Sequence, residues 1–139
     1  MEINTHKKAQ PRLLGTPVYI EENVRAEVEL KTNHEMAVDE HGLVHGGFTF
    51  GLADYAAMLA INHPNVVLGA SEIRFLAPVE VGDELVAVAD VLEHEGKRKK
   101  VDVVVSANKK PVLEGVMTCY VLDHHVLDRN HSSEQCADH

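Results

Sequence analysis

Residues 48–61 constrain the fold most strongly, because they form an apolar segment that is long enough for a helix and ends at a turn signal in residues 63–65. Within residues 52–61 the only charged side chain is that of Asp54. A helix that is apolar nearly all round must be covered on most of its sides. The sequence therefore predicts a buried helix at the centre of the fold, with one carboxylate in it.

The remaining segments have the patterns of β-strands. In residues 24–31 apolar side chains alternate with charged ones, which predicts a strand with one wet face. Four further strand-like runs, rich in valine, lie near residues 66–76, 84–92, 100–107 and 112–122. The breaks between these runs are too short for crossover helices. We therefore expect four antiparallel neighbours in a meander.

One long helix and about five strands favour an α+β architecture, in which a curved antiparallel sheet wraps around the helix. A second copy of the chain is expected to cover the remaining edge or face of the sheet. Residues 1–139 are expected to form a single domain, with its core at about 24–122. The polar tail at 128–139 lacks periodicity and is expected to be flexible.

The charge of the chain excludes some function classes. Thirteen Lys and Arg against twenty-two Asp and Glu give a formal net charge of −9, so a general binder of nucleic acid or anionic membranes is not expected. The N-terminus lacks the apolar core of a signal peptide, and no run is long enough to span a bilayer. We expect a cytoplasmic protein. Cys119 alternates with Met117 and Val121 and is expected to be a reduced core thiol.

Asp54 requires an explanation, because an ionised carboxylate on a buried helix costs free energy. Desolvation raises the pKa of such a carboxylate and makes it a better general base or nucleophile near neutral pH. An aspartate paired with a buried donor or with a partner chain would explain the residue about as well.

Gly46 and Gly47 stand where the helix begins. Without side chains, they let a ligand approach the backbone N–H groups at the positive end of the helix dipole, which suits the oxyanion of a thioester under attack. A tight turn is the commoner use of a Gly-Gly pair. Gly46 and Asp54 lie roughly 12 Å apart along one helix axis, so one carbonyl can contact both only across two subunits.

An ordered set of motifs follows the chain: His-Gly-Gly at 45–47, the helix carboxylate at 54, the segment IRFLAPV at 73–79 and Gly-Asp at 82–83. This set resembles the hotdog-fold acyl-CoA thioesterases of the phenylacetate-pathway type over about residues 24–122. The resemblance implies that Asp54 is the base or nucleophile on the thioester and that the Gly46 N–H polarises the carbonyl from the opposite subunit. It also implies an acyl-CoA substrate, hydrolysis without a cofactor, and a homodimer or a dimer of dimers.

The chain departs from this family at one position. The family commonly has an asparagine six residues before the histidine, where this chain has Asp39, and an ionised aspartate cannot donate a hydrogen bond to a carbonyl. We expect Asp39 and Ser71 to position water or substrate, Gly47 to shape the loop and His45 to hold it. If the match to the family is shifted by two residues along this strand, Gly69 takes the place of Ser71 in this role.

Lys97 and Arg98 follow a Glu-Gly turn and are candidates for binding the phosphates of coenzyme A, although a solvated hairpin tip is the usual role of such residues. A second basic pair, Lys109 and Lys110, lies at the opposite end of the intervening strand.

No metal is expected. His41 and His45 have helical spacing, but the neighbouring glycines indicate a loop, and no third ligand completes a site.

Two other functions stay open. The first is a noncatalytic acyl-CoA sensor or binding protein on the same fold, which the aspartate at position 39 favours. The second is a hotdog dehydratase or hydratase that pairs His41 with Asp54. The proline-rich loop of those enzymes is missing here, which weighs against the second reading.

Overall fold

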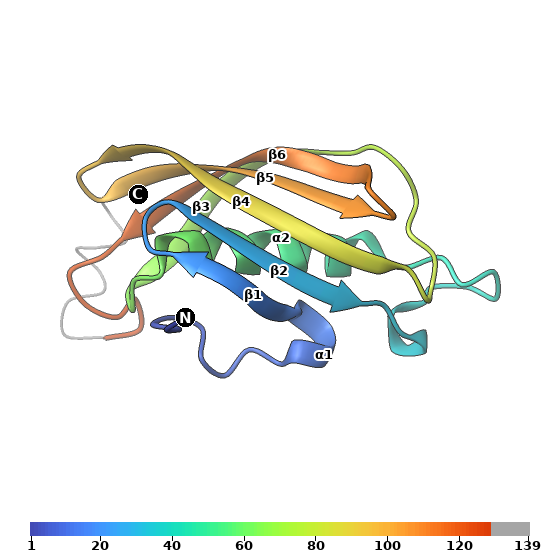
Figure 1. The fold of residues 1–139 in the computed structure, drawn as a ribbon. Helices are drawn as coiled ribbons and strands as arrows, with labels where there is room; N and C mark the ends of the chain where they lie inside the picture. The colour runs from blue at the N-terminus through green and yellow to red at the C-terminus, as the bar shows by residue number, and fades with distance from the viewer. Residues whose placement is uncertain (129–139) are drawn as a thin grey trace.

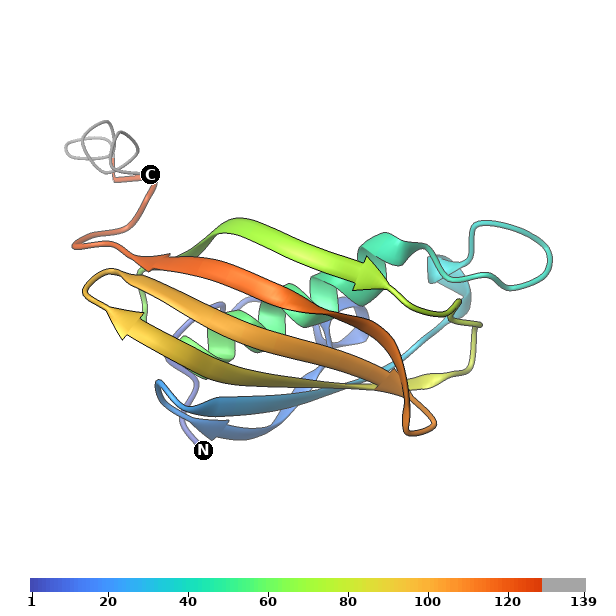
Figure 2. The same cartoon turned by 90° about the horizontal axis from the view of Figure 1, so that it is seen from above.

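The fold is one long helix wrapped by an antiparallel sheet (Figures 1 and 2). The computed structural model describes residues 1–128, so the predicted tail at 128–139 lies outside the described residues except for Asp128. The sheet has six strands in the order β1-β2-β4-β5-β6-β3. The predicted α+β architecture is confirmed. The elements are α1 (Pro11–Leu14), β1 (Thr16–Glu21), β2 (Arg25–Lys31), η1 (His34–Met36), α2 (Gly46–Ile61), β3 (Val66–Phe75), β4 (Glu84–Glu95), β5 (Arg98–Ala107) and β6 (Lys110–Val121).

The central helix α2 is buried on most of its sides, as its sequence predicts. Ten of its side chains are buried, including the run from Tyr55 to Ile61. The helix ends at Asn62, which has the left-handed conformation with φ 57° and donates its N–H to the carbonyl of Met58. Asp54 lies among these buried residues and is itself partly exposed.

The N-terminal segment, residues 1–14, covers α2 on the side away from β4, β5 and β6 (Figure 1). The apolar side chains of this segment pack against the core. The Asn62 side chain holds the start of the segment through two hydrogen bonds of 2.8 Å: its Oδ1 atom accepts the N–H of Asn4, and its Nδ2 atom donates to the carbonyl of Glu2. The sequence predicts that a second copy of the chain covers the remaining edge or face of the sheet. Within one chain, residues 1–14 pack against the core beside α2.

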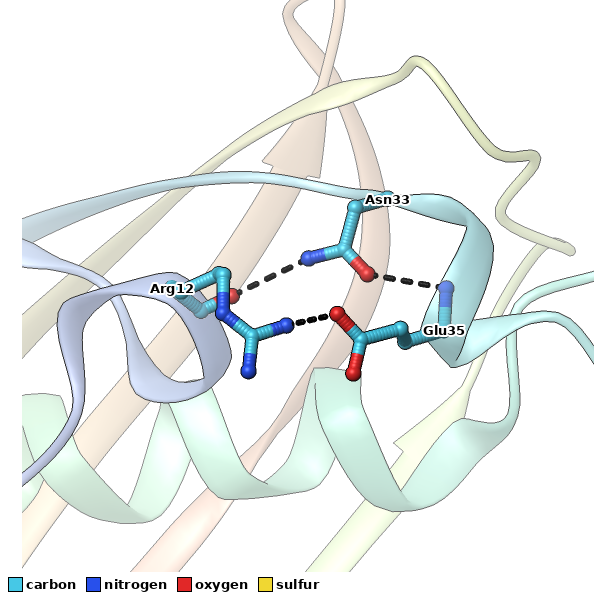
Figure 3. Close-up of polar contacts among 3 residues, drawn as sticks. All are labelled: Arg12, Asn33 and Glu35. Carbon is cyan, nitrogen blue, oxygen red and sulfur yellow. Dashed lines mark hydrogen bonds and ion pairs between the residues drawn. The ribbon is translucent and has the colours of Figure 1, made fainter.

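The N-terminal segment is also tied to the loop that leads into α2 (Figure 3). Arg12 forms an ion pair with Glu35, and the Asn33 side chain donates to the carbonyl of Arg12 at 3.2 Å. Asn33 also accepts the N–H of Glu35 at 3.0 Å, which caps η1. These contacts connect α1 with η1 at the N-terminal end of α2.

The predicted meander of four strands is wrong for β3. Only β4, β5 and β6 form a meander, whereas β3 pairs with β6 at the far edge of the sheet. Residues 76–83 therefore cross the end of the sheet. The crossing is anchored at Thr32, whose hydroxyl donates to the carbonyl of Asp83 at 2.8 Å and accepts the N–H of Gly82 at 2.9 Å.

β3 lies so close to β6 that one position of β6 must be glycine. A Cβ atom at Gly115 would lie 2.2 Å from the carbonyl oxygen of Glu72. Within residues 1–128 the other side of β3 has no strand beside it in the sheet, and residues 69–72 are exposed. No helix within residues 1–128 is long and apolar enough to cross a membrane.

Candidate active site

Asp54 lies in the middle of α2 and lines a cavity of about 430 Å³. Its Oδ1 atom is buried and has no hydrogen-bond partner within residues 1–128. Burial raises the pKa of Asp54 from 3.8 to about 6. The carboxylate is therefore available to accept a proton close to neutral pH.

Cys119 lies on β6 near this carboxylate. It is a free thiol and fully buried, so the expected reduced core thiol is confirmed. Burial, together with the charge of Asp54, raises the pKa of Cys119 to about 12. The thiol stays protonated at neutral pH and cannot act as a nucleophile there.

The N-terminus of α2 holds the two glycines. His45 is the N-cap residue, and its Nδ1 atom accepts the N–H of Gly47 at 2.7 Å. The N–H of Gly46 makes no hydrogen bond within the part of the chain that the structure describes. Gly46 lines a cavity of about 340 Å³ with Thr49 and Phe75. An unused donor at the positive end of a helix is suited to bind an oxyanion.

Asp39 belongs to the exposed loop before α2. Its Oδ1 atom accepts the N–H groups of His41 at 3.0 Å and Leu43 at 3.1 Å. In a single chain the carboxylate thus stabilises the turn of its own loop, and neither it nor His41 lines the cavity of Asp54.

Ser71 lies on the edge strand β3, opposite the buried Met117, and therefore on the face of the sheet that carries the helix. Its side chain is exposed, and it does not line the cavity of Asp54. Gly69 lies in a bulge beside the ring of Tyr120, where a Cβ atom would lie 2.4 Å from Cε2. This close contact with the Tyr120 ring explains why residue 69 is a glycine.

Lys97 and Arg98 lie at the turn between β4 and β5, close to the C-terminal end of α2. The Nζ atom of Lys97 lies 2.8 Å from a carboxylate oxygen of Asp123. Lys97 lines a cavity of about 450 Å³ that shares Asn65 with the cavity of Asp54. The basic turn therefore adjoins the Asp54 cavity, and it lies at the other end of α2 from Gly46.

One chain does not bring all the predicted residues together. Gly46 and Asp54 lie eight residues apart on the same helix and line different cavities. The Asp54 cavity also contains residues that sequence reasoning missed, in particular Thr5, His6 and His125. They come from segments without periodicity, so no pattern marked them. Within residues 1–128 no group of three His, Cys, Asp or Glu side chains is placed to hold a metal ion.

Comparisons with known proteins agree with this architecture. A family model described as the thioesterase superfamily matches residues 41–114. Among solved structures, an uncharacterised protein from Pyrococcus horikoshii, PH1136, is 59% identical, with a TM-score of 0.90 over 92% of this chain and 98% of that one. PaaI of the phenylacetic acid degradation operon of E. coli is 27% identical, with a TM-score of 0.73 over 81% of this chain and 83% of that one.

Two curated relatives are considerably longer than this chain. The methylthioribose-1-phosphate isomerase of Aquifex aeolicus (strain VF5) is 49% identical over 124 residues, which are 88% of this chain and 27% of that protein. The transcription factor FapR of Caldanaerobacter subterraneus subsp. tengcongensis is 26% identical over 117 residues, which are 84% of this chain and 58% of that protein. This chain therefore spans about a quarter of the first relative and somewhat more than half of the second.

Proposed function

This chain belongs to the thioesterase superfamily, and from that premise we propose that it hydrolyses an acyl-CoA or a related thioester to the free acid and the thiol. The observation that carries the proposal is the Asp54 carboxylate, which has a buried oxygen without a hydrogen-bond partner in residues 1–128 and a pKa raised to about 6 by burial. A buried carboxylate without a structural partner lowers stability, and such groups are typical of active sites. The similarity to PaaI supports the same reading.

In the proposed reaction Asp54 acts as a general base. It accepts a proton from a water molecule while the water oxygen forms a bond to the thioester carbon. The carbonyl oxygen becomes an oxyanion, which accepts the free N–H of Gly46. The C–S bond then breaks, the thiolate leaves, and the proton passes from Asp54 to the thiolate. Direct attack by the carboxylate, followed by hydrolysis of the anhydride, is the alternative role for Asp54.

We propose that the site lies between two subunits, with Gly46 from one and Asp54 from the other. The separation of roughly 12 Å along α2 supports this arrangement. Two surfaces support a partner copy. One is the open edge of β3. The other consists of exposed apolar side chains: Phe75 and Leu76 in the wall of the Gly46 cavity, and Val38 and Leu43 in the loop before α2. In the assembled dimer Asp39 and Ser71 position water or substrate, and Lys97 and Arg98 bind the phosphates of coenzyme A.

A single domain over residues 1–139 and a cytoplasmic location are further parts of the proposal.

A complementation experiment tests both the chemistry and the arrangement. Gly46 is the first residue of α2, where proline is well tolerated, so Gly46→Pro removes the N–H donor and keeps the helix. Gly46→Ala is the matched control, because it keeps the N–H and adds only a Cβ 3.2 Å from the Phe75 ring. We expect Gly46→Pro and Asp54→Asn each to lower the rate of thiol release from a panel of short, long and aromatic acyl-CoAs by about 10²-fold or more. Gly46→Ala, which keeps the N–H, should lose less activity than Gly46→Pro.

Refolding the two inactive variants together distinguishes the arrangements. If the site crosses subunits, each mixed dimer contains one intact site, and roughly a quarter of the wild-type activity should return. No return of activity would contradict the shared site. Wild-type protein that releases no thiol from any member of the panel would contradict hydrolysis. A folded monomer at micromolar concentration in sedimentation would contradict the dimer.

A noncatalytic acyl-CoA sensor is the second candidate. The aspartate at position 39 favours it, because that carboxylate accepts hydrogen bonds from its own loop and cannot donate one to a carbonyl. The similarity to FapR, a transcription factor, supports a role other than catalysis. Binding of acyl-CoA in calorimetry without any release of thiol would establish this candidate.

A further inference from the structure

The cavity of Asp54 has a second titratable side chain in its wall. His6 lines this cavity from the N-terminal segment and is an exposed residue. The mechanism proposed above does not use this residue. Its ring centroid lies 6.4 Å from that of Tyr55, the residue that follows Asp54 on α2.

The backbone around His6 is held in place. The preceding residue, Thr5, is buried, and the segment is bound to the C-cap of α2 by the two hydrogen bonds of Asn62. His6 itself has a φ of 51°, a left-handed conformation that is uncommon outside Gly and that Asn, Asp and His adopt more often than other residues. The same helix therefore positions Asp54 and anchors the segment that carries His6. A residue held in an uncommon conformation at a cavity is a candidate for a functional role.

The hydrogen bond of the His6 ring engages one of its two nitrogen atoms. The Nδ1 atom lies 2.7 Å from the hydroxyl oxygen of Thr5. When Nδ1 carries the proton and donates it to that oxygen, Nε2 is left with a lone pair for a bound molecule. Burial of part of the ring lowers the pKa of His6 below 6.5, which favours the neutral imidazole at pH 7.

Within residues 1–128, the charged or titratable groups beside His6 are Asp54 and His125, which line the same cavity, and Tyr55, whose ring lies next to that of His6. The Nδ1 atom of His125 accepts the N–H of Leu127 at 3.0 Å. No Lys or Arg side chain from residues 1–128 lines the cavity. Most of the remaining wall is apolar, from Met58 and β3. His6 and Asp54 are thus polar groups on a largely apolar wall.

We propose that His6 positions the attacking water for Asp54: one O–H of the water donates to the Asp54 carboxylate and the other to the Nε2 atom of His6. This inference rests on the hydrolysis proposed above. The two hydrogen bonds fix both protons of the water, so that its lone pair points at the thioester carbon. Only the proton held by Asp54 is transferred. His6 is a positioning residue, and it must be neutral to accept its hydrogen bond.

Two variants separate this role from a structural one. His6→Asn removes the imidazole and keeps a residue that tolerates the left-handed conformation, and His6→Gly does the same without a side chain. His34→Asn is the matched control, because His34 is an exposed histidine of η1 outside the cavity. We expect kcat/KM to fall about 10- to 100-fold in both His6 variants and to stay unchanged in His34→Asn. Melting temperatures should agree with the wild type.

The pH profile gives a readout that a structural role would not change. With Asp54 and His6 both required in their deprotonated forms, log kcat/KM of the wild type should rise with a limiting slope of about two on the acid side. The slope should fall to about one in His6→Asn. Added imidazole should restore activity to His6→Gly, and it should have no effect on the wild type.

The outcomes are distinguishable. A wild-type protein that hydrolyses thioesters, together with a His6→Asn variant of unchanged rate and slope, overturns the role of His6 and leaves the proposed function standing. Loss of activity in His6→Gly without rescue by imidazole also overturns it. A wild-type protein that is inert toward every thioester overturns the proposed function and the role of His6 with it.

Discussion

His45 Nδ1 accepts a 2.7 Å hydrogen bond from the N–H of Gly47, and a Cβ atom at residue 47 would lie 2.8 Å from that same nitrogen. The N-cap and the second glycine therefore depend on each other. The two glycines therefore differ in role. Gly47 makes room for the His45 ring that caps the helix, whereas the N–H of Gly46 stays unused within residues 1–128.

The N-cap should contribute measurably to stability. His45→Ala removes the acceptor and should lower the free energy of unfolding by about 0.5–2 kcal/mol, whereas His45→Asn supplies another good N-cap and should lose less. Urea unfolding of the three proteins at one pH measures the difference. Equal losses in both variants would show that the imidazole contributes through packing instead, since its ring meets that of Phe48 edge-on with centroids 6.3 Å apart.

Asp54→Asn should change stability in a way that depends on pH. The pKa of Asp54 is raised in the folded state, from 3.8 to about 6, so the folded protein binds more protons than the unfolded chain between those values. The carboxylate therefore lowers stability progressively as the pH rises from about 4 to 6, by up to about 3 kcal/mol. The amide does not titrate, so its stability relative to the wild type should rise across that interval. Urea titrations at several pH values between 4 and 7.5 measure this difference.

The kinetics of the same variant test the chemical assignment. If Asp54 is the base or nucleophile, kcat of Asp54→Asn should fall about 10²- to 10⁴-fold while the protein stays folded. A folded variant with wild-type turnover would rule out the assignment. A variant that loses stability at pH 7 would instead identify Asp54 as a structural group paired across an interface.

Removing the basic turn should weaken substrate binding more than turnover. Lys97→Ala combined with Arg98→Ala should raise KM for acyl-CoA more than it lowers kcat, and added salt should have the same effect on the wild type. Lys110→Ala, at the other end of β5, is the control. The ion pair of Lys97 with Asp123 is exposed, so its loss should cost less than about 1 kcal/mol. An unchanged KM would mean that the turn does not bind the nucleotide.

Two glycine substitutions should have opposite effects. At Gly115 the new methyl group would lie 2.2 Å from a backbone carbonyl oxygen of β3, so Gly115→Ala should cost about 3 kcal/mol and loosen β3 from β6. At Gly51 the nearest atom is a side-chain methyl of Leu14 at 3.1 Å, which can move, and alanine favours a helix by about 0.5–1 kcal/mol. Hydrogen exchange of the β3 amides and urea unfolding compare the two variants. A stable Gly115→Ala protein would show that β3 can shift along β6.

The central helix and the meander were predictable because local patterns determine them. An apolar segment with one carboxylate has few ways to be buried. The strands β4, β5 and β6 are recognisable from their patterns and are joined by short turns. The position of β3 was not predictable in this way. The break at residues 76–83 is short enough to join neighbours, and only the pairing with β6 shows that it crosses the sheet.

The candidate site was predictable where the chemistry is local. A charged residue in an apolar helix and glycines at its start can be read from the sequence. Among the residues that the structure describes, Asp54 has an oxygen without a partner and the N–H of Gly46 is unused. His6 carried no signal of this kind, because its link to Asp54 exists only after residues 1–14 pack against α2. The sequence does not predict β1, because the residues of this strand show no clean alternation between buried and exposed positions.

The crossing at residues 76–83 sets an order in which the sheet can assemble during synthesis. The pairs within the β4-β5 and β5-β6 hairpins are at most 22 residues apart, whereas β3 pairs with residues of β6 that lie 38 to 55 positions further along the chain. Loop closure is slower and entropically more costly for the distant pairs. On the ribosome β3 therefore emerges well before its partner and has to wait, unpaired, until β6 has been made. The edge of the sheet formed by β3 is therefore completed last, so each chain folds before that edge can pair with another copy of the chain.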